Sequence, residues 1–158
     1  MRVISGGQTG VDRAALDAAV ECRLQSGGWC PRDRRAEDGA VPTRYMLKET
    51  PSTRYGQRTE WNIRDADATL ILVRSLPLSG GTLLTQETAL RLGKPVLVSR
   101  IAEAEQDGIL RWLLDLEVRI LNIAGPRESG EPGIGQEARS FLRILFSLWI
   151  EHEQRGES

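Results

Sequence analysis

A glycine-rich stretch near the N-terminus carries the clearest chemical signal, Ser5-Gly6-Gly7-Gln8-Thr9-Gly10. Glycine lets backbone N–H groups approach an oxyanion because no Cβ stands in the way. A helix that begins directly after such a turn adds unpaired N–H donors and the positive end of its dipole. The Gln8 and Thr9 side chains can also donate hydrogen bonds, and Asp12 suits the first turn of that helix. The stretch therefore predicts a phosphate- or oxyanion-binding turn; the alternative is a tight strand-to-helix turn without a ligand.

Two nucleotide-binding motifs do not fit this stretch. In the dinucleotide fingerprint Gly7 and Gly10 fill the second and third glycine positions, but Ser5 stands at the first. No Asp or Glu closes the second expected strand to hold a ribose, and Arg32 lies nearby instead. The Gly-Lys-Ser/Thr sequence of the P-loop does not follow the turn either. The sequence therefore disfavours an NAD site and a Walker-type ATP site.

Two further polar stretches with glycine follow later strands, Ser79–Thr82 and Gly125–Ser129. Ligands of open α/β sheets bind beyond the carboxyl ends of the strands, so we expect both stretches to meet the first turn at one edge. Gly80, Gly81 and Thr82 would then form a second clamp on the same ligand. Glu87, one turn further along, is either a general base or a solvated side chain, and we favour the solvated one.

Several arginines could pair with an anion through bidentate hydrogen bonds. Arg34 lies in a segment, 32–39, whose mixed charges equally indicate a self-neutralised surface loop. Arg58 shares one polar helical side with Tyr55, Thr59 and Asn62, and that side is either solvent-facing or part of a site. Arg127 and Ser129 in the last glycine-bearing loop pose the same alternative.

Composition excludes several classes of protein. The 158 residues suit one domain, residues 1–158. A net charge of −1 gives no general attraction for nucleic acid. The sequence has two cysteines and one histidine, without metal-ligand spacing, so we expect no metal site and no catalytic triad. No apolar run resembles a signal peptide or approaches the roughly 20 residues that span a membrane, so we expect a cytoplasmic protein with no membrane partner.

Strands and helices alternate along the chain, which predicts an α/β fold with a mainly parallel sheet. Apolar, β-branched runs predict five strands, the second of them doubtful, at 2–5, 27–30, 68–73, 95–98 and 118–124. Helical periodicity predicts helices over 11–23, 55–65, 79–92, 103–116 and 135–153. Trp61 is expected to anchor the second helix inward, and Leu116 and Trp149 are expected among the buried residues of the last two. We expect 32–39 to be an irregular surface loop.

Together, these segments resemble the putative molybdenum carrier family. The longest matching blocks are Ser5-Gly6-Gly7-Gln8-Thr9-Gly10-Val11-Asp12-Arg13-Ala14-Ala15-Leu16-Asp17 and Asn122-Ile123-Ala124-Gly125-Pro126-Arg127-Glu128-Ser129. Others are Gly28-Trp29-Cys30-Pro31, Arg34-Arg35-Ala36-Glu37-Asp38-Gly39, Arg58-Thr59-Glu60-Trp61-Asn62 and Gly80-Gly81-Thr82. Asp33 departs from the pattern, because a glycine is expected there, and an acid at that point could repel an anion.

The resemblance implies a Rossmann-like, three-layer α/β/α fold related to lysine-decarboxylase-like and DNA-processing-A-like proteins. It also implies a non-catalytic, homo-oligomeric (dimeric or tetrameric) carrier of molybdenum cofactor, a molybdopterin with a terminal phosphate, or of molybdate. The rival hypothesis is a nucleotide-processing enzyme of the phosphoribohydrolase type, or a nucleotide-sensing module. Against the enzyme, Gly80-Gly81-Thr82 lacks a third glycine and Glu87 is the only acid in the helix behind it. The predicted ligand-binding residues are Gly6, Gly7, Gln8, Thr9, Gly10, Asp12, Arg34, Arg58, Gly80, Gly81, Thr82, Arg127 and Ser129, with no catalytic residue and no metal ligand.

Overall fold

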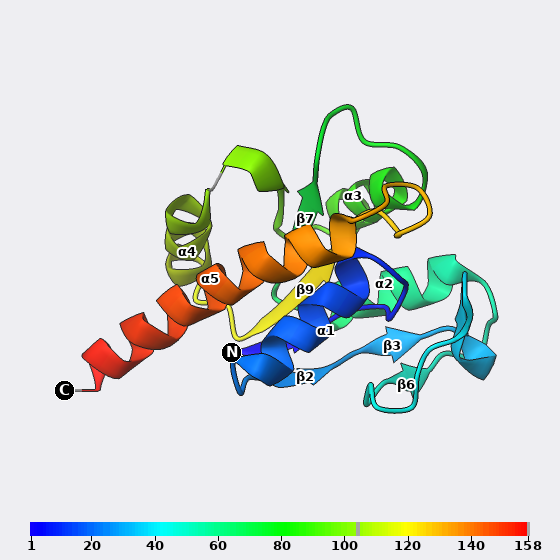
Figure 1. The fold of residues 1–158 in the computed structure, drawn as a ribbon, viewed down its shortest axis with the longest axis horizontal. Coiled ribbons are helices and arrows are strands. Elements are labelled where there is room, and N and C mark those ends of the chain that lie inside the picture. Colours follow the sequence, from blue (N-terminus) through cyan, green and yellow to red (C-terminus); the bar gives the residue numbers. More distant parts are fainter. Residues whose placement is uncertain (104, 158) are drawn as a thin grey trace.

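The computed structural model describes residues 1–103 and 105–157, so Ala104, near the start of the fourth predicted helix, and Ser158 lie outside the described residues. Its centre is a five-stranded, fully parallel sheet in the order β2-β1-β9-β7-β8 (Figure 1). The strands are β1 (Arg2–Ile4), β2 (Gln25–Gly27), β7 (Ala68–Val73), β8 (Val96–Arg100) and β9 (Ile120–Ala124). The predicted parallel α/β sheet is confirmed.

Five α-helices cover the two faces of this sheet: α1 (Val11–Glu21), α2 (Tyr55–Asp65), α3 (Gly80–Arg91), α4 (Gln106–Asp115) and α5 (Ile134–Gly156). Right-handed crossovers place helices on opposite faces when the chain moves in opposite directions along the sheet. The step from β1 to β2 runs opposite to the step from β7 to β8, which separates α1 from α3. Accordingly α5 packs on α1 and α4, and α2 packs on α3, which completes the three layers (Figure 1).

The positions of α1 and β7 in the core account for the sequence patterns that predicted them. Every residue of β7 is buried, as expected for a central strand covered on both faces. Four alanines of α1, at 14, 15, 18 and 19, are buried against the sheet and α5, where larger side chains would hold the layers apart. Phe141, Leu142, Leu145 and Phe146 of α5 fill the space over them.

Residues 25–50 differ most from the expectation. The predicted strand 27–30 is divided at Gly28 (φ +124°), where a Cβ would lie 2.4 Å from the Ser5 carbonyl oxygen. Only β2 joins the main sheet, while β3 (Trp29–Cys30) pairs with β6 (Lys48–Glu49) in a separate two-stranded sheet. The predicted loop 32–39 contains a short 3-10 turn, η1 (Arg32–Arg34), and then a hairpin of β4 (Arg35–Ala36) and β5 (Gly39–Ala40).

Three predicted anchors are less buried than expected. Trp61 is half-buried and meets the Trp29 ring edge-to-face at 4.8 Å, while Ile63 is the fully buried anchor of α2. Leu116 is exposed because α4 ends before it, at Asp115. Trp149 is half-buried because α5 extends beyond the layer beneath it (Figure 1). Another 3-10 turn, η2 (Ile101–Glu103), follows β8. Among the described helices, none is long and apolar enough to cross a membrane.

Candidate functional site

A cavity of about 530 Å³ opens at the carboxyl ends of β1, β9 and β7. Its walls come from the first turn, the exposed N-terminal part of α2, the loop that enters α3, and the loop after β9. Eight predicted residues line it: Gly6, Gln8, Asp12, Arg58, Gly80, Gly81, Thr82 and Arg127. Tyr55, Thr59 and Asn62 line it as well, so this polar side of α2 belongs to the cavity. Gly7, Thr9, Gly10, Arg34 and Ser129 are not among its lining residues.

The glycines of the first turn are packed against the protein itself. A Cβ on Gly6 would lie 2.2 Å from the Arg58 guanidinium, and one on Gly7 would lie 2.6 Å from Leu47. A Cβ on Gly10 would lie 2.4 Å from the Pro126 carbonyl oxygen. Gly7 and Gly10 also have φ angles of +75° and +79°, which L-residues rarely adopt. Gly7 and Gly10 are therefore required by the fold, whether or not a ligand binds, while at Gly6 a larger residue would have to displace the Arg58 side chain.

Two carboxylates of the protein accept hydrogen bonds from donors of this turn. The Gln8 backbone N–H donates to Asp12 Oδ2 at 3.1 Å. The hydroxyls of Thr9 and Ser129 both donate to Glu37, and the Ser129 N–H donates to the same carboxylate at 3.2 Å. Burial opposes ionisation of Glu37, but these hydrogen bonds from Ser129 and Thr9 hold its pKa below the ordinary value. Thr9 and Ser129 thus hold Glu37 in place by hydrogen bonds, a role that the sequence did not reveal.

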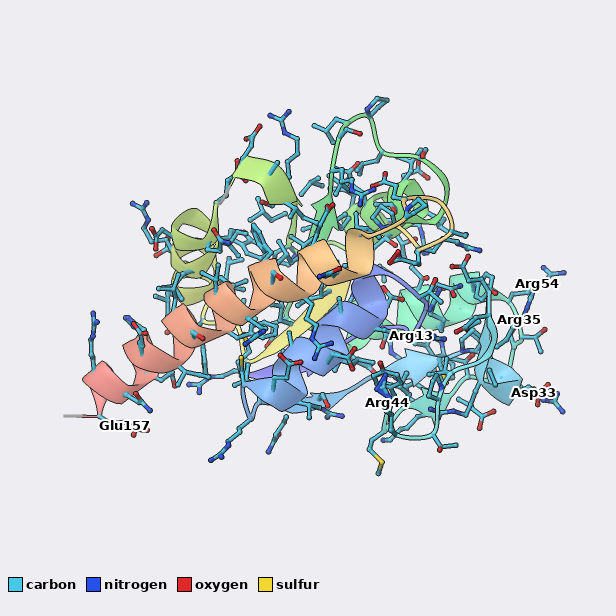
Figure 2. The ribbon with its side chains drawn as sticks, in the orientation of Figure 1. Arg13, Asp33, Arg35, Arg44, Arg54 and Glu157 are labelled. Carbon is cyan, nitrogen blue, oxygen red and sulfur yellow. The ribbon has the colours of Figure 1, made fainter. Side chains whose placement is uncertain are left out.

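The hairpin that carries Glu37 is fixed to α1 by a second acid. Arg13 makes a bidentate ion pair with Asp38, at 2.6 and 2.7 Å, and its Nε donates to the Gly7 carbonyl oxygen at 3.0 Å. Figure 2 shows Arg13 between α1 and the hairpin, and Arg35 at the far end near α2. The Glu37 and Asp38 carboxylates of the segment 32–39 therefore pair with Arg127 and Arg13, and not with the arginines of the segment itself.

Asp12 and Arg58 form a buried ion pair at the cavity wall. Arg58 Nη1 lies 3.3 Å from Asp12 Oδ2 and donates to the Gly6 carbonyl oxygen at 2.7 Å. Burial raises the pKa of Asp12, and the charge of Arg58 with the Gln8 N–H counteracts that rise. Because a buried charge without its partner is costly, each of these two side chains stabilises the position of the other.

Three guanidinium groups surround one aromatic ring at this wall. Arg35, Arg58 and Arg127 lie 4.8, 5.3 and 5.4 Å from the centroid of Tyr55. Asp12 pairs with Arg58, and Glu37 lies 3.9 Å from Arg127. Arg35 donates to the Thr53 carbonyl oxygen and has no carboxylate partner among the described residues. Arg35 does not line the cavity, and the charged side chains that do, Asp12, Arg58, Arg127 and Glu131, carry no net charge together.

The second glycine turn has the opposite character to the first. No atom of the described structure lies within 4 Å of a Cβ built on Gly80 or Gly81, and both exposed residues line the cavity. The first N–H groups of a helix have no acceptor within it. Those of Gly80, Gly81 and Thr82 have no partner in residues 1–103 and 105–157, and Ser79 makes no side-chain cap. The N-terminus of α3 is thus an open anion-binding end.

The loop after β9 contains one acid that caps a helix and another that lines the cavity. Glu128 caps α5, accepting hydrogen bonds from the N–H groups of Gly133 at 2.5 Å and Gly135 at 3.0 Å. Glu131 lines the cavity, and its Oε2 is buried without a hydrogen-bond partner in the described structure. The Gln8 Nε2 is in the same situation. Sequence reasoning missed Glu131, because a single acid in a Gly- and Pro-rich loop carries no local signal.

Other candidates lie away from the cavity. Arg34 donates to the carbonyl oxygens of Val41, Pro42, Tyr45 and Leu47, so its guanidinium holds the 41–47 segment instead of facing the cavity. Glu87 is exposed on α3 and does not line the cavity.

The backbone conformation of Asp33 accounts for its departure from the family pattern. It adopts φ +64°, a conformation that favours glycine and that aspartate tolerates better than most residues. Asp33 therefore stands at a position whose backbone conformation favours the glycine of the family pattern. No group of three or more His, Cys, Asp or Glu that could hold a metal ion occurs in the described part of the chain.

Comparison with known proteins agrees with this architecture. The model of the circularly permutated YpsA SLOG family matches residues 3–146. The chain is similar to a protein of known crystal structure, the putative molybdenum carrier protein from Syntrophus aciditrophicus SB. The two sequences are 40% identical, and the match covers 91% of this chain and 93% of that protein's chain, with a TM-score of 0.86. No curated protein matches. The resemblance and the Rossmann-like fold expected from the sequence are confirmed, and the chain belongs to the circularly permutated YpsA SLOG family.

Proposed function

We propose that this protein is a carrier that binds molybdenum cofactor, or molybdate, in the cavity at the carboxyl edge of its sheet. The similar protein from Syntrophus aciditrophicus SB bears the name putative molybdenum carrier protein, which supports a molybdenum-related ligand. A cavity of about 530 Å³ falls within the roughly 300–1,000 Å³ typical of small-molecule sites. That volume suits a pterin with a phosphate.

The observation that carries the proposal is the open N-terminus of α3, opposite Arg58 and Arg127. Three backbone N–H groups there have no partner among the described residues, and glycine leaves the space above them free. An anion at this end would meet the helix dipole as well as these donors. We therefore place the phosphate or oxyanion at Gly80–Thr82, and not within the first turn, where the protein's own carboxylates accept hydrogen bonds from the Gln8 backbone N–H and the Thr9 hydroxyl. Gly6 and Gln8 would contact the ligand from the opposite side.

The same geometry gives little support to the rival enzyme. Its proposed general base, Glu87, is exposed and does not line the cavity. Of the two carboxylates that do, Asp12 is engaged by Arg58, and we assign Glu131 to ligand recognition. We propose binding and protection of the ligand without chemistry on it.

The test is ligand-induced thermal stabilisation with molybdate, molybdopterin cofactor and AMP as probes. In Gly81→Asp the new carboxylate would lie at the α3 N-terminus, where it favours the helix but repels an anion. Gly108→Asp is the matched control, because Gly108 is in the first turn of α4 and also has open space around its Cβ. Gly7→Asp is unsuitable, because it would displace Leu47 and strain the backbone.

The expected result is a rise in melting temperature with molybdopterin cofactor or molybdate in the wild type and in Gly108→Asp. Gly81→Asp should fold normally and lose that rise. A rise with AMP alone would contradict the molybdenum assignment, and an unchanged response of Gly81→Asp would contradict the placement at α3.

We also propose a cytoplasmic homo-oligomer that binds neither nucleic acid nor membranes. Leu83, Leu84 and Leu90 are exposed on α3, beside the half-buried apolar residues of β8, whose outer edge is unpaired in the described sheet. A second copy would cover this surface. Light scattering after size-exclusion chromatography should give a dimer or tetramer that Leu90→Glu weakens, and a monomeric wild type would contradict this.

A further inference from the structure

Two polar atoms at the cavity are buried without a hydrogen-bond partner in the described structure: Gln8 Nε2, a donor, and Glu131 Oε2, an acceptor. Buried polar atoms in folded proteins are nearly always paired, because an unpaired one loses its hydration without compensation. Both residues line the cavity, so a small turn of each side chain would bring these atoms to a bound ligand.

The orientation of the Gln8 amide is fixed by its surroundings. Its Oε1 accepts hydrogen bonds from the backbone N–H groups of Thr9 at 3.1 Å and Glu37 at 2.9 Å. Turning the amide over would set its NH₂ group against these two donors. Because the oxygen is held in place, both N–H groups of Nε2 remain for a ligand acceptor, and Gln8 is only 5% exposed.

Glu131 offers a different kind of contact. The other carboxylate that lines the cavity, Asp12, already accepts from Gln8 and pairs with Arg58. Within the described residues, Glu131 makes no ion pair or side-chain hydrogen bond, and its charge interacts with Arg74 over a longer distance. A carboxylate of this kind repels a bare oxyanion and accepts N–H donors, most strongly two adjacent ones that match its two oxygens.

We propose that the cavity recognises a heterocycle with a 2-amino-4-oxo-pyrimidine edge, as found in pterins and in guanine, in addition to an anionic group. Glu131 accepts the ring N–H and the adjacent amino group, and the Gln8 amide donates to an acceptor of the ligand. The proposal rests on the binding function above and specifies its ligand: an anion that carries this heterocycle and not molybdate alone.

Calorimetric titration tests the proposal with four probes: GMP, IMP, pterin-6-carboxylate and sodium molybdate. GMP and IMP differ only in the 2-amino group. The wild type should bind GMP at least about tenfold more tightly than IMP, because a site built to pair with a donor discriminates against its loss. The pterin should bind at least as tightly as GMP if molybdopterin is the natural ligand.

Glu131→Gln removes the charge while keeping the shape of the side chain. It should weaken GMP and pterin binding by about 10- to 100-fold, since charge-assisted hydrogen bonds are lost. It should strengthen molybdate binding, because the repelling carboxylate is gone. Opposite signs for the two ligand classes would not arise from a merely structural role. Glu87→Gln, an exposed change outside the cavity, is the control and should alter neither.

Equal affinities for GMP and IMP, together with intact molybdate binding, would overturn the heterocycle proposal and leave the carrier function standing. Parallel losses for molybdate and GMP in Glu131→Gln would also overturn it. If GMP binds more tightly than the pterin, the edge recognition holds and the molybdopterin assignment fails. If no probe binds and molybdopterin cofactor does not raise the melting temperature, both the function and this inference fail.

Discussion

The two glycine turns look alike in the sequence and differ in the structure. Each joins a strand to a helix and begins with Ser-Gly-Gly. In the first, Arg58, Leu47 and Pro126 occupy the space where Cβ atoms would lie. In the second, no atom approaches the corresponding positions of Gly80 and Gly81. Glycine at the first turn therefore serves packing, whereas at the second turn Gly80 suits a backbone φ of +53° and Gly81 has only open space around it.

The electrostatics of the two turns follow the same division. The first turn has its own anions, because Asp12 and Glu37 accept hydrogen bonds from Gln8, Thr9 and Ser129. The N-terminus of α3 has no such internal partner in the described structure. A turn that carries its own carboxylates contributes to stability without a ligand, while an open helix end gains only when an anion binds. Substitutions at the first turn should therefore change folding, and those at the second should change binding.

The largest effect is expected from Arg58→Met, which removes the guanidinium from the buried pair with Asp12. Both side chains are about nine-tenths buried, at 10% and 9% exposure. Breaking a buried ion pair on one side costs about 3–5 kcal/mol of unfolding free energy. Urea denaturation measures this loss of unfolding free energy. The double variant Asp12→Asn/Arg58→Met should recover more than half of the loss, and no recovery would show that Arg58 acts through packing alone.

Gly10→Ala should come next. The new Cβ would lie 2.4 Å from the Pro126 carbonyl oxygen at a φ of +79°, so both contact and backbone are unfavourable. We expect a loss of about 3 kcal/mol in urea denaturation. Gly39→Ala separates the two causes, because Gly39 has φ +114° but no atom within 4 Å of a Cβ. A similar loss in both variants would mean that backbone strain, and not the approach of the two loops, explains Gly10.

Glu37→Gln tests whether the first turn depends on an internal anion. Replacing a carboxylate that accepts hydrogen bonds from Thr9 and Ser129 should cost about 2 kcal/mol at pH 7. Because folding lowers the pKa of Glu37, its contribution is present above the ordinary glutamate value of 4.5 and is lost as pH falls through the lower folded value. The difference from wild type should therefore shrink below pH 4.5 in denaturation curves. A constant difference for Glu37→Gln would disprove the role of its charge.

The sequence predicted the parts of the molecule that depend on local pattern. The helix Tyr55–Asp65 and the strand Ala68–Val73 begin and end as expected, because amphipathic spacing and a continuous apolar run are local signals. Residues 25–50 were misjudged because β3 and β6 pair with each other across an irregular segment, and pairing partners are not visible locally.

The sequence predicted a ligand site at the carboxyl edge of the sheet, where the structure has a cavity, and this site stays a prediction. The carboxyl edge of a parallel sheet follows from the fold, and eight of the thirteen predicted residues line the cavity there. The roles of Thr9, Ser129 and Glu37 depend on contacts over 28 and 92 positions in the sequence. A glycine pattern also cannot reveal whether a ligand or another loop needs the missing Cβ, since both require the same residue.

The smallest effect is expected at the second turn, from Gly81→Ala. Its Cβ meets no atom within 4 Å, and alanine restricts the unfolded chain, so the helix should gain about 0.5 kcal/mol. The same methyl group would stand over the N–H groups at the α3 N-terminus and should weaken ligand binding several-fold, as in close anion sites that favour glycine. Gly108→Ala in α4 should give a similar gain in denaturation without any change in binding. A gain in stability with a loss in affinity at Gly81 alone would identify this glycine as one retained for the ligand, whereas equal behaviour of the two variants would leave α3 without a special role.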